Sequence, residues 1–394
     1  MIRRSYIDVP WGESVADSEN MPLMPPPIEA QVGSVLVAQA SATVTMDANR
    51  RQTGPMSALL PKRRPQTASR WKVFRARVLW FFALLVSVSA ATPGALAQTP
   101  PPQGQPDGAA ALLQGWLQGS PAAPKRGVLY ELRSGTNTVY LYGTIHLGKV
   151  DFYPMNAAIP RAITASSRVY LETDLGDPAA AANMTRAERY PDGITLDKKL
   201  PAALMTKVET VFGEYGVTRQ EIKSTKPWAL ANDLLTRKAS EMGYEPMFAP
   251  DIYVAGTAQL LGKQISGLES IDEQIQVFDS ISEAGQQAYL EDALSAFESG
   301  RLGTMLQASV DAWASGDAAT MAAALKKEQE EEPVALGEIR RKLLDERNAR
   351  MAERIELIAR SGTPAFVAVG AAHLVGRDSV VELLRKKGLS IREL

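Results

Sequence analysis

The stretch "PAFVAVGAAHL" (Pro364 to Leu374) is an almost uninterrupted apolar run that ends in small residues and a histidine. An apolar run of this length without polar alternation predicts a strand that is buried on both faces. An earlier stretch, "TVYLYGTIHL" (Thr138 to Leu147), has the same ending, Gly-x-x-His-Leu. Ligands and catalytic groups gather where the strands of an open α/β sheet finish. We therefore expect both stretches in one sheet, with their two endings within reach of each other.

The chain contains only two histidines, His146 and His373, and both occupy this motif. Glycine accounts for 29 of the 394 residues, so its presence three positions before both histidines would be a rare coincidence. Gly143 and Gly370 allow the backbone to bend or to approach a neighbour closely. A single histidine near a strand end is more often a hydrogen-bonded structural residue than a ligand. The repeated motif is what favours a functional pair.

The remaining pattern predicts an α/β fold with a central mixed β-sheet formed by both ends of the mature chain and a long helical middle insertion. Residues 127–134 and 138–147, joined by "GTN", indicate a β-hairpin. From Leu200 to about Arg360 the apolar residues recur at intervals of three and four, which is typical of helices. Further strands are expected at 167–175, 263–270 and 389–394. Helices are expected at 156–165, 200–214, 226–242, 251–261, 271–282, 285–299, 302–314, 317–328, 335–360 and 377–387.

The N-terminal part of the chain reads as a targeting segment. Residues 1–68 are polar and proline-rich, so we interpret them as a disordered leader or as the result of a mis-assigned start. Residues 69–97 combine a basic flank, an apolar run and the triplet Ala-Leu-Ala ending at Ala97, the three parts of a secretory signal peptide. Cleavage after Ala97 and export to the periplasm are predicted. The alternative is an inner-membrane anchor through residues 78–97, which is the only membrane association we expect.

After cleavage, residues 98–124 read as a flexible proline-rich linker and residues 125–394 as the folded domain. The net charge of -1 gives no reason to expect a nucleic-acid partner. The absence of cysteine excludes disulfides, thiolate metal sites and a cysteine nucleophile. The oligomeric state is not indicated by the sequence.

Two carboxylates could complete a site around the histidines. Imidazole ligates Mn, Co, Zn or Fe and also shuttles protons near neutral pH, but two histidines alone make an incomplete metal site. Glu172 ends "VYLE" and Glu269 follows "ISGL". An unpaired carboxylate on a buried strand is costly, so each needs a metal, another cation or a cage of hydrogen bonds. The alternative for each is a solvent-exposed strand end. Glu346 and Arg350 have the i,i+4 spacing of an ordinary solvated ion pair.

Over residues 127 to 394 the chain resembles the TraB/GumN family, which includes the PrgY-like and Tiki proteins. The resemblance rests on eight motifs in order: "LYGTIHLGK", "DFYPM", "VYLETDL", "KPWAL", "ISGLESIDEQIQVFD", "WASGD", "DERNARMAERI" and "VAVGAAHLVG".

The resemblance implies a fold related to the ChaN and erythromycin-esterase group, with an active site formed by the paired Gly-x-x-His motifs and a strand-borne glutamate. The Tiki branch is regarded as metal-dependent proteases, so the implied protein is an exported metallohydrolase that acts on a peptide or other small substrate. Its divalent ion (Mn, Co or Zn) would be held by His146, His373 and Glu172. Glu269 would accept a proton or support a ligand, and Arg347 would bind a substrate carboxylate or the developing oxyanion.

Two other classes of function remain open. The protein could bind haem, a metal or a peptide without turning it over, in which case Glu269 and Arg347 would be dispensable. It could instead be an exopolysaccharide accessory protein, in which case both histidines would tolerate replacement.

Overall fold

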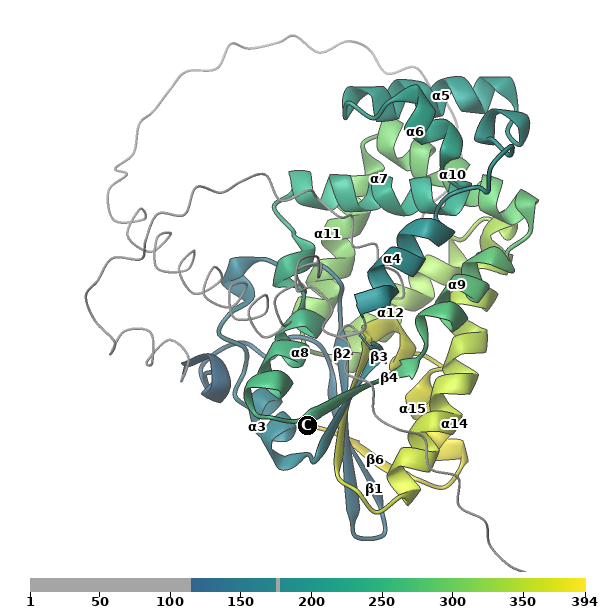
Figure 1. The fold of residues 1–394 in the computed structure, drawn as a ribbon. Helices are drawn as coiled ribbons and strands as arrows, with labels where there is room; N and C mark the ends of the chain where they lie inside the picture. The colour runs from purple at the N-terminus through teal and green to yellow at the C-terminus, as the bar shows by residue number, and fades with distance from the viewer. Residues whose placement is uncertain (1–114, 175–177) are drawn as a thin grey trace, which may run out of the picture.

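The computed structural model describes residues 115–174 and 178–394 of the protein (Figure 1). The expected leader, signal peptide and membrane anchor all lie outside these residues. Within them, no helix combines the length and the apolar character needed to cross a membrane.

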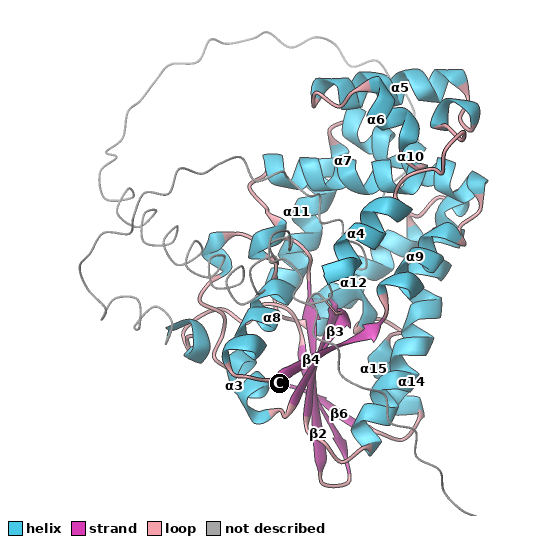
Figure 2. Ribbon diagram, in the orientation of Figure 1, coloured by secondary structure: helices cyan, strands magenta, loops and turns pink. Residues whose placement is uncertain are grey.

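A six-stranded mixed sheet forms the centre of the domain (Figure 2). Its strands run in the spatial order β4-β3-β5-β2-β1-β6, where β4, β3, β5 and β2 are parallel, β1 is antiparallel to β2, and β6 is antiparallel to β1. The expected α/β class and the sheet built from both ends of the folded part are confirmed. The bounds of the strands are β1 Leu129–Ser134, β2 Asn137–Thr144, β3 Arg168–Thr173, β4 Gln264–Glu269, β5 Ala365–Gly370 and β6 Ser390–Glu393.

Helices surround this sheet and make up most of the middle of the chain. Their bounds are α3 Ala158–Ala165, α4 Pro178–Ala187, α5 Ala202–Glu214, α6 Arg219–Ser224, α7 Pro227–Glu241, α8 Pro250–Leu260, α9 Ile271–Asp279, α10 Glu283–Glu298, α11 Arg301–Ala314, α12 Ala318–Glu330, α13 Gly337–Arg340, α14 Glu346–Arg360 and α15 Val380–Lys386.

The central strand β5 shows why the sheet is covered on both faces. Its side chains alternate between two clusters, because successive residues of a strand point to opposite sides. Phe366 and Ala368 belong to a cluster with side chains of α3 and α8. Val367 and Val369 belong to the larger cluster, which includes side chains of α14, α15 and the helical middle. Figure 1 shows α3 and α8 on one side of the sheet, α14 and α15 on the other, and the remaining helices above the carboxyl ends of the parallel strands.

The structure differs from the expected helices at three places. The single helix expected at 335–360 is interrupted by a π-helical segment, Arg341–Asp345, directly before α14. Helix α4 was missed because its alanine-rich sequence offers few large apolar residues at helical spacing. Helix α6 was missed although Thr218 and Glu221 form a capping box at its start, a signal that the sequence carries.

The end of the expected linker packs against the domain. The Trp116 ring stacks on Tyr153 with ring centroids 5.1 Å apart, and it also contacts the ring of Tyr253. The Tyr253 hydroxyl donates a hydrogen bond to the Trp116 carbonyl oxygen at 3.0 Å. Trp116 thus packs against residues of the folded part, although it precedes the boundary expected at Lys125.

Candidate functional site

The strands that carry the motifs are neighbours, as the sequence predicts. β5 lies between β3 and β2, and β2 pairs with β5 in parallel with Thr144 opposite Gly370. Both Gly-x-x-His segments therefore leave the sheet at the carboxyl ends of their parallel strands, beside the carboxyl end of β3. A Cβ atom on Gly143 would lie 3.0 Å from Ala371, so glycine permits this close approach. Gly370 has an extended backbone that any residue adopts, and its amide donates a hydrogen bond to Glu172.

His373 is fully buried and is held through one ring nitrogen. Its Nδ1 lies 2.6 Å from Asn348 Oδ1, while Asn348 Nδ2 donates to the Asp378 carbonyl oxygen at 3.0 Å. Because the NH2 group of Asn348 donates to that carbonyl, the side-chain oxygen of Asn348 faces the imidazole. His373 Nδ1 must therefore carry the proton. The other nitrogen, Nε2, then carries a lone pair. It is buried and has no hydrogen-bond partner within the described chain. It lies 3.8 Å from Glu172 Oε1.

His146 is held in the same way by a different kind of partner. It follows β2 by two residues, and its Nδ1 lies 2.7 Å from Asp251 Oδ2 in the first turn of α8. A carboxylate only accepts hydrogen bonds, so Nδ1 donates here as well. Both imidazoles therefore present Nε2 as the nitrogen that is available for other chemistry.

A buried ion cluster lies beside His373. Arg347 Nη2 lies 2.7 Å from Glu172 Oε2 and 2.8 Å from Glu269 Oε2, and Arg347 Nε donates to the same Glu269 oxygen at 2.9 Å. Arg350 approaches the second Glu269 oxygen more loosely, at 3.5 Å. The cation that each strand-borne glutamate needs is thus supplied by α14. The structure excludes the alternative of exposed strand ends, because Glu172 and Glu269 are both buried.

Burial and local charges shift the pKa values of three side chains in the site. Burial alone would raise the pKa of Glu172, but the charges of Arg347, His373 and His146 and the Gly370 amide together lower it to about 2. Burial and the charge of Arg347 lower the pKa of His373 to about 3, so this imidazole is neutral at physiological pH. Burial would also lower the pKa of His146, but the attraction and the hydrogen bond of Asp251 outweigh it and raise the pKa. Both histidines lie close enough to Glu172 to act on it electrostatically.

Sequence reasoning placed five of these side chains but missed three partners. Asp251 was missed because an acid in the first turn after a helix-starting proline is a common capping pattern that singles nothing out. Asn348 lies in the motif "DERNARMAERI", and the sequence alone indicates no role for it. The solvated pair expected between Glu346 and Arg350 is wrong: Glu346 faces Arg341 and Lys342, which leaves Arg350 to face Glu269.

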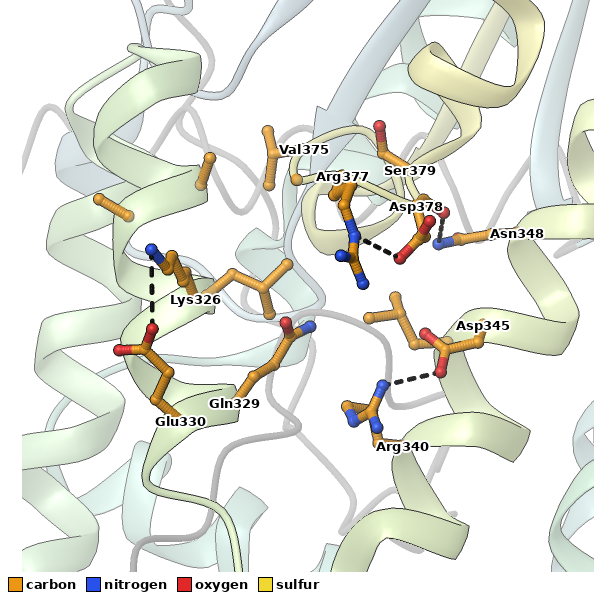
Figure 3. A pocket seen from close by; sticks show the side chains of 15 residues that line it. Lys326, Gln329, Glu330, Arg340, Asp345, Asn348, Val375, Arg377, Asp378 and Ser379 are labelled. Atoms are coloured by element: carbon orange, nitrogen blue, oxygen red, sulfur yellow. Dashed lines mark hydrogen bonds and ion pairs between the residues drawn. The ribbon is translucent and has the colours of Figure 1, made fainter. Parts of the chain in front are cut away.

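A cleft of about 690 Å³ borders this cluster through Asn348 (Figure 3). It lies between α12, the segment from Arg340 to Asn348, and the loop from Val375 to Ser379. Figure 3 shows that ion pairs surround it and that the Asn348 amide reaches Asp378 across its wall. Asn348 thus contacts the cleft and His373 at once. Neither histidine and none of the three buried charged residues described above lines this cleft.

Fold and site together define an α/β protein with two strand-end histidines beside a buried glutamate–arginine cluster. The family model described as TraB/PrgY/gumN family matches residues 128–393, and the chain belongs to this family.

Several curated proteins are distant relatives. The chain is 24% identical over 301 residues to the protein named Metalloprotease TIKI1 of Danio rerio, a match that covers 64% of this chain and 60% of that protein. It is also 24% identical over 306 residues to Metalloprotease TIKI homolog of Nematostella vectensis, covering 65% and 64%. Uncharacterized protein YbaP of Escherichia coli (strain K12) is 23% identical over 253 residues, covering 64% and 89%. The chain thus spans roughly 60% of the length of the first two relatives. No solved structure matches it.

The metal implied by these names fits the donor atoms, although the side chains are not gathered around a common point. Among the residues that the structure describes, no three His, Asp or Glu side chains are placed to hold an ion together. The chemistry of the donors is nevertheless suitable. In each histidine a partner holds Nδ1 and leaves Nε2 free to bind an ion, as is usual for metal-ligating histidines. The buried Nε2 of His373 has no hydrogen-bond donor in the part of the chain that the structure describes, and it faces the Glu172 carboxylate, which is ionised.

Proposed function

We propose that the protein is a metal-dependent hydrolase whose divalent ion is held by His146, His373 and Glu172, and whose substrate is a peptide or another small molecule. One observation carries the proposal. Among the described residues, no donor reaches the buried lone pair of His373 Nε2, which lies 3.8 Å from the Glu172 carboxylate. Two acceptors that face each other in a buried site call for a cation or a proton donor between them. The names of the Tiki relatives support the metal and the hydrolytic chemistry.

Each residue of the chain has a part in this proposal. An ion bound there would polarise a substrate carbonyl and lower the pKa of a bound water. Asn348 and Asp251 orient the two imidazoles through Nδ1. Arg347 and the Gly370 amide keep Glu172 ionised.

Glu269 and Arg347 take modified roles in the proposal. Both oxygens of Glu269 face guanidinium groups, so we assign Glu269 to neutralise and hold Arg347. Arg347 already donates to two carboxylates, and we therefore assign it to hold those carboxylates in place. The proton-accepting role of Glu269 and the binding of a substrate oxyanion by Arg347 stay predictions.

The test is a thermal shift on the full chain with and without Mn, Co or Zn. Metal that binds only the folded state should stabilise the wild type by about 2.7 kcal/mol at a concentration one hundred times its Kd. His146→Ala and His373→Ala should each lose most of this shift, because a site with few ligands loses both a bond and its geometry. Asp279→Ala, which removes a surface ion pair with Lys226, is the control and should keep the full shift.

Equal metal-induced shifts in the wild type and both histidine variants would contradict the proposal. Metal binding without hydrolysis of any peptide would indicate a binding protein instead. Unchanged metal binding and function in both histidine variants would favour an accessory role.

We also propose that the protein acts in the periplasm after cleavage behind Ala97, on the basis of the signal-like segment at residues 69–97. N-terminal sequencing of the exported protein tests this. A cytoplasmic protein that retains residues 69–97 would contradict it.

A further inference from the structure

We propose that Asp251 is a positioning residue, which fixes the tautomer and the ring orientation of His146 so that Nε2 points into the site. The partner of His146 Nδ1 lies outside the sequence motif that carries this histidine. The partner comes from the first turn of α8, 105 residues further along the chain. The inference rests on the proposed function for its chemical purpose, but its main test does not depend on metal or activity.

The contact itself permits one assignment of the proton. Asp251 Oδ2 lies 2.7 Å from His146 Nδ1, and the two side chains are 14% and 8% exposed. An ionised carboxylate accepts only, so the neutral imidazole must carry its proton on Nδ1 and keep its lone pair on Nε2. Asp251 makes no other side-chain hydrogen bond within the described residues, and its Oδ1 is buried without a partner. A largely buried carboxylate whose single partner is a histidine serves that histidine, since burying it is costly otherwise.

The loop of His146 and the start of α8 are joined as one unit. Gly148 and Glu245 exchange two backbone hydrogen bonds, of 3.0 and 2.8 Å. A Cβ atom on Gly148 would lie 1.8 Å from the Phe248 carbonyl oxygen, so only glycine allows the two segments to meet. This fixed spacing lets Asp251 reach the imidazole.

Two tyrosine hydroxyls also hold α8 in place through hydrogen bonds to the backbone. The Tyr153 hydroxyl donates to the carbonyl oxygen of Phe248 at 2.9 Å and lies 3.2 Å from that of Ala249, the residue that caps α8. The Tyr253 hydroxyl binds the backbone at Trp116, as described above. The position of Asp251 is therefore set by the packing around α8.

The presence of only two histidines in the chain makes a direct test possible. Full-length protein labelled with ¹⁵N-histidine, purified without a histidine tag, gives signals from two imidazoles, and the nitrogen that carries the proton is read from its ¹⁵N shift. At a pH above the raised pKa of His146, found by following its signals until they stop shifting, both imidazoles are neutral and the wild type should show the Nδ1–H tautomer at both rings. Asp251→Ala should move His146 toward the Nε2–H form and leave His373 unchanged. Asp251→Asn should show less of the Nδ1–H form at His146 than the wild type, because its amide can donate to Nδ1 as well as accept from it.

A second measurement connects the tautomer to the site. Asp251→Ala should weaken binding of Mn, Co or Zn by about 10- to 100-fold, the usual effect of removing the partner of a ligating histidine. Asp251→Asn should weaken it less. Asp279→Ala is the matched control, since it removes an aspartate from a surface ion pair, and it should change neither the tautomers nor the affinity.

Three results would overturn the proposal. The first is a wild-type His146 in the Nε2–H form, a measurement that needs no variant and so remains decisive if Asp251→Ala does not fold. The second is an unchanged tautomer in Asp251→Ala. The third is an equal change in both rings, which would make Asp251 a general structural residue. A wild type that binds no metal would refute the proposed function and leave the tautomer result standing.

Discussion

The two histidines share a motif in the sequence and stand in different surroundings in the structure. His373 belongs to an inner half of the site, where its side chain is fully buried beside Glu172, Arg347 and the neutral amide of Asn348. His146 belongs to an outer half, where its side chain is 8% exposed and paired with the carboxylate of Asp251. The pKa of the first is lowered and that of the second is raised. The motif therefore determines where each imidazole leaves the sheet, while a partner from a distant helix determines its proton chemistry.

The largest expected effect concerns the ion cluster of the inner half. Arg347→Met should lower the free energy of unfolding by about 3–5 kcal/mol, because it leaves Glu172 and Glu269 buried without their shared cation. Arg350→Met is the matched control. The Arg350 side chain is 35% exposed and its Nη2 lies 3.5 Å from Glu269, so we expect a loss of about 1 kcal/mol or less. Urea unfolding of both variants measures the difference, and equal losses would show that the buried contacts of Arg347 stabilise the protein no more than the loose contact of Arg350.

A smaller effect is expected from the partners of the two imidazoles. Asn348→Ala should cost about 1–3 kcal/mol, because it leaves the buried His373 Nδ1–H without an acceptor. Asp251→Ala should cost less, because water can reach the more exposed outer half. Urea unfolding at neutral pH compares the two, and a larger loss for Asp251→Ala would reverse the assignment of inner and outer halves.

The smallest effect is expected in the pH dependence of stability, because the two histidines oppose each other. The raised pKa of His146 adds stability that is fully present below its unfolded value near 6.5 and is lost as pH rises through the folded value. The lowered pKa of His373 adds stability above 6.5 that is lost as pH falls toward about 3. From about pH 7 to about pH 5 the two contributions change in opposite directions.

Asp251→Asn separates these contributions, because it removes the charge that raises the pKa of His146. Its free energy of unfolding should fall more steeply than that of the wild type between about pH 7 and about pH 5. Urea unfolding at several pH values measures both curves, and groups elsewhere in the protein cancel in the comparison. Parallel curves would show that Asp251 does not control the protonation of His146.

The sequence predicted the inner half of the site better than the outer half. The neighbouring strands follow from apolar runs that end in charge, which is a local signal, whereas the sequence left open whether Glu172 and Glu269 are buried or exposed. The contact between Asp251 and His146 depends on how α8 packs against the sheet, and no spacing in the sequence encodes it. The i,i+4 spacing of Glu346 and Arg350 predicted a solvated helix face, but Arg350 faces Glu269. The periodicity also predicted a single helix where the π-helical segment precedes α14.

The pairing of β2 with β5 has a consequence for how the protein is made. Val139 lies opposite Ala365, so the centre of the sheet joins segments separated by most of the folded chain. Contacts of such long sequence separation form slowly, because a large loop must close before they contribute. During synthesis from the N-terminus, His146 and Glu172 emerge long before β5 exists to stand between their strands. A chain interrupted before Ala365 would lack the central strand, His373 and the amide that binds Glu172, so the site is complete only when synthesis is nearly finished.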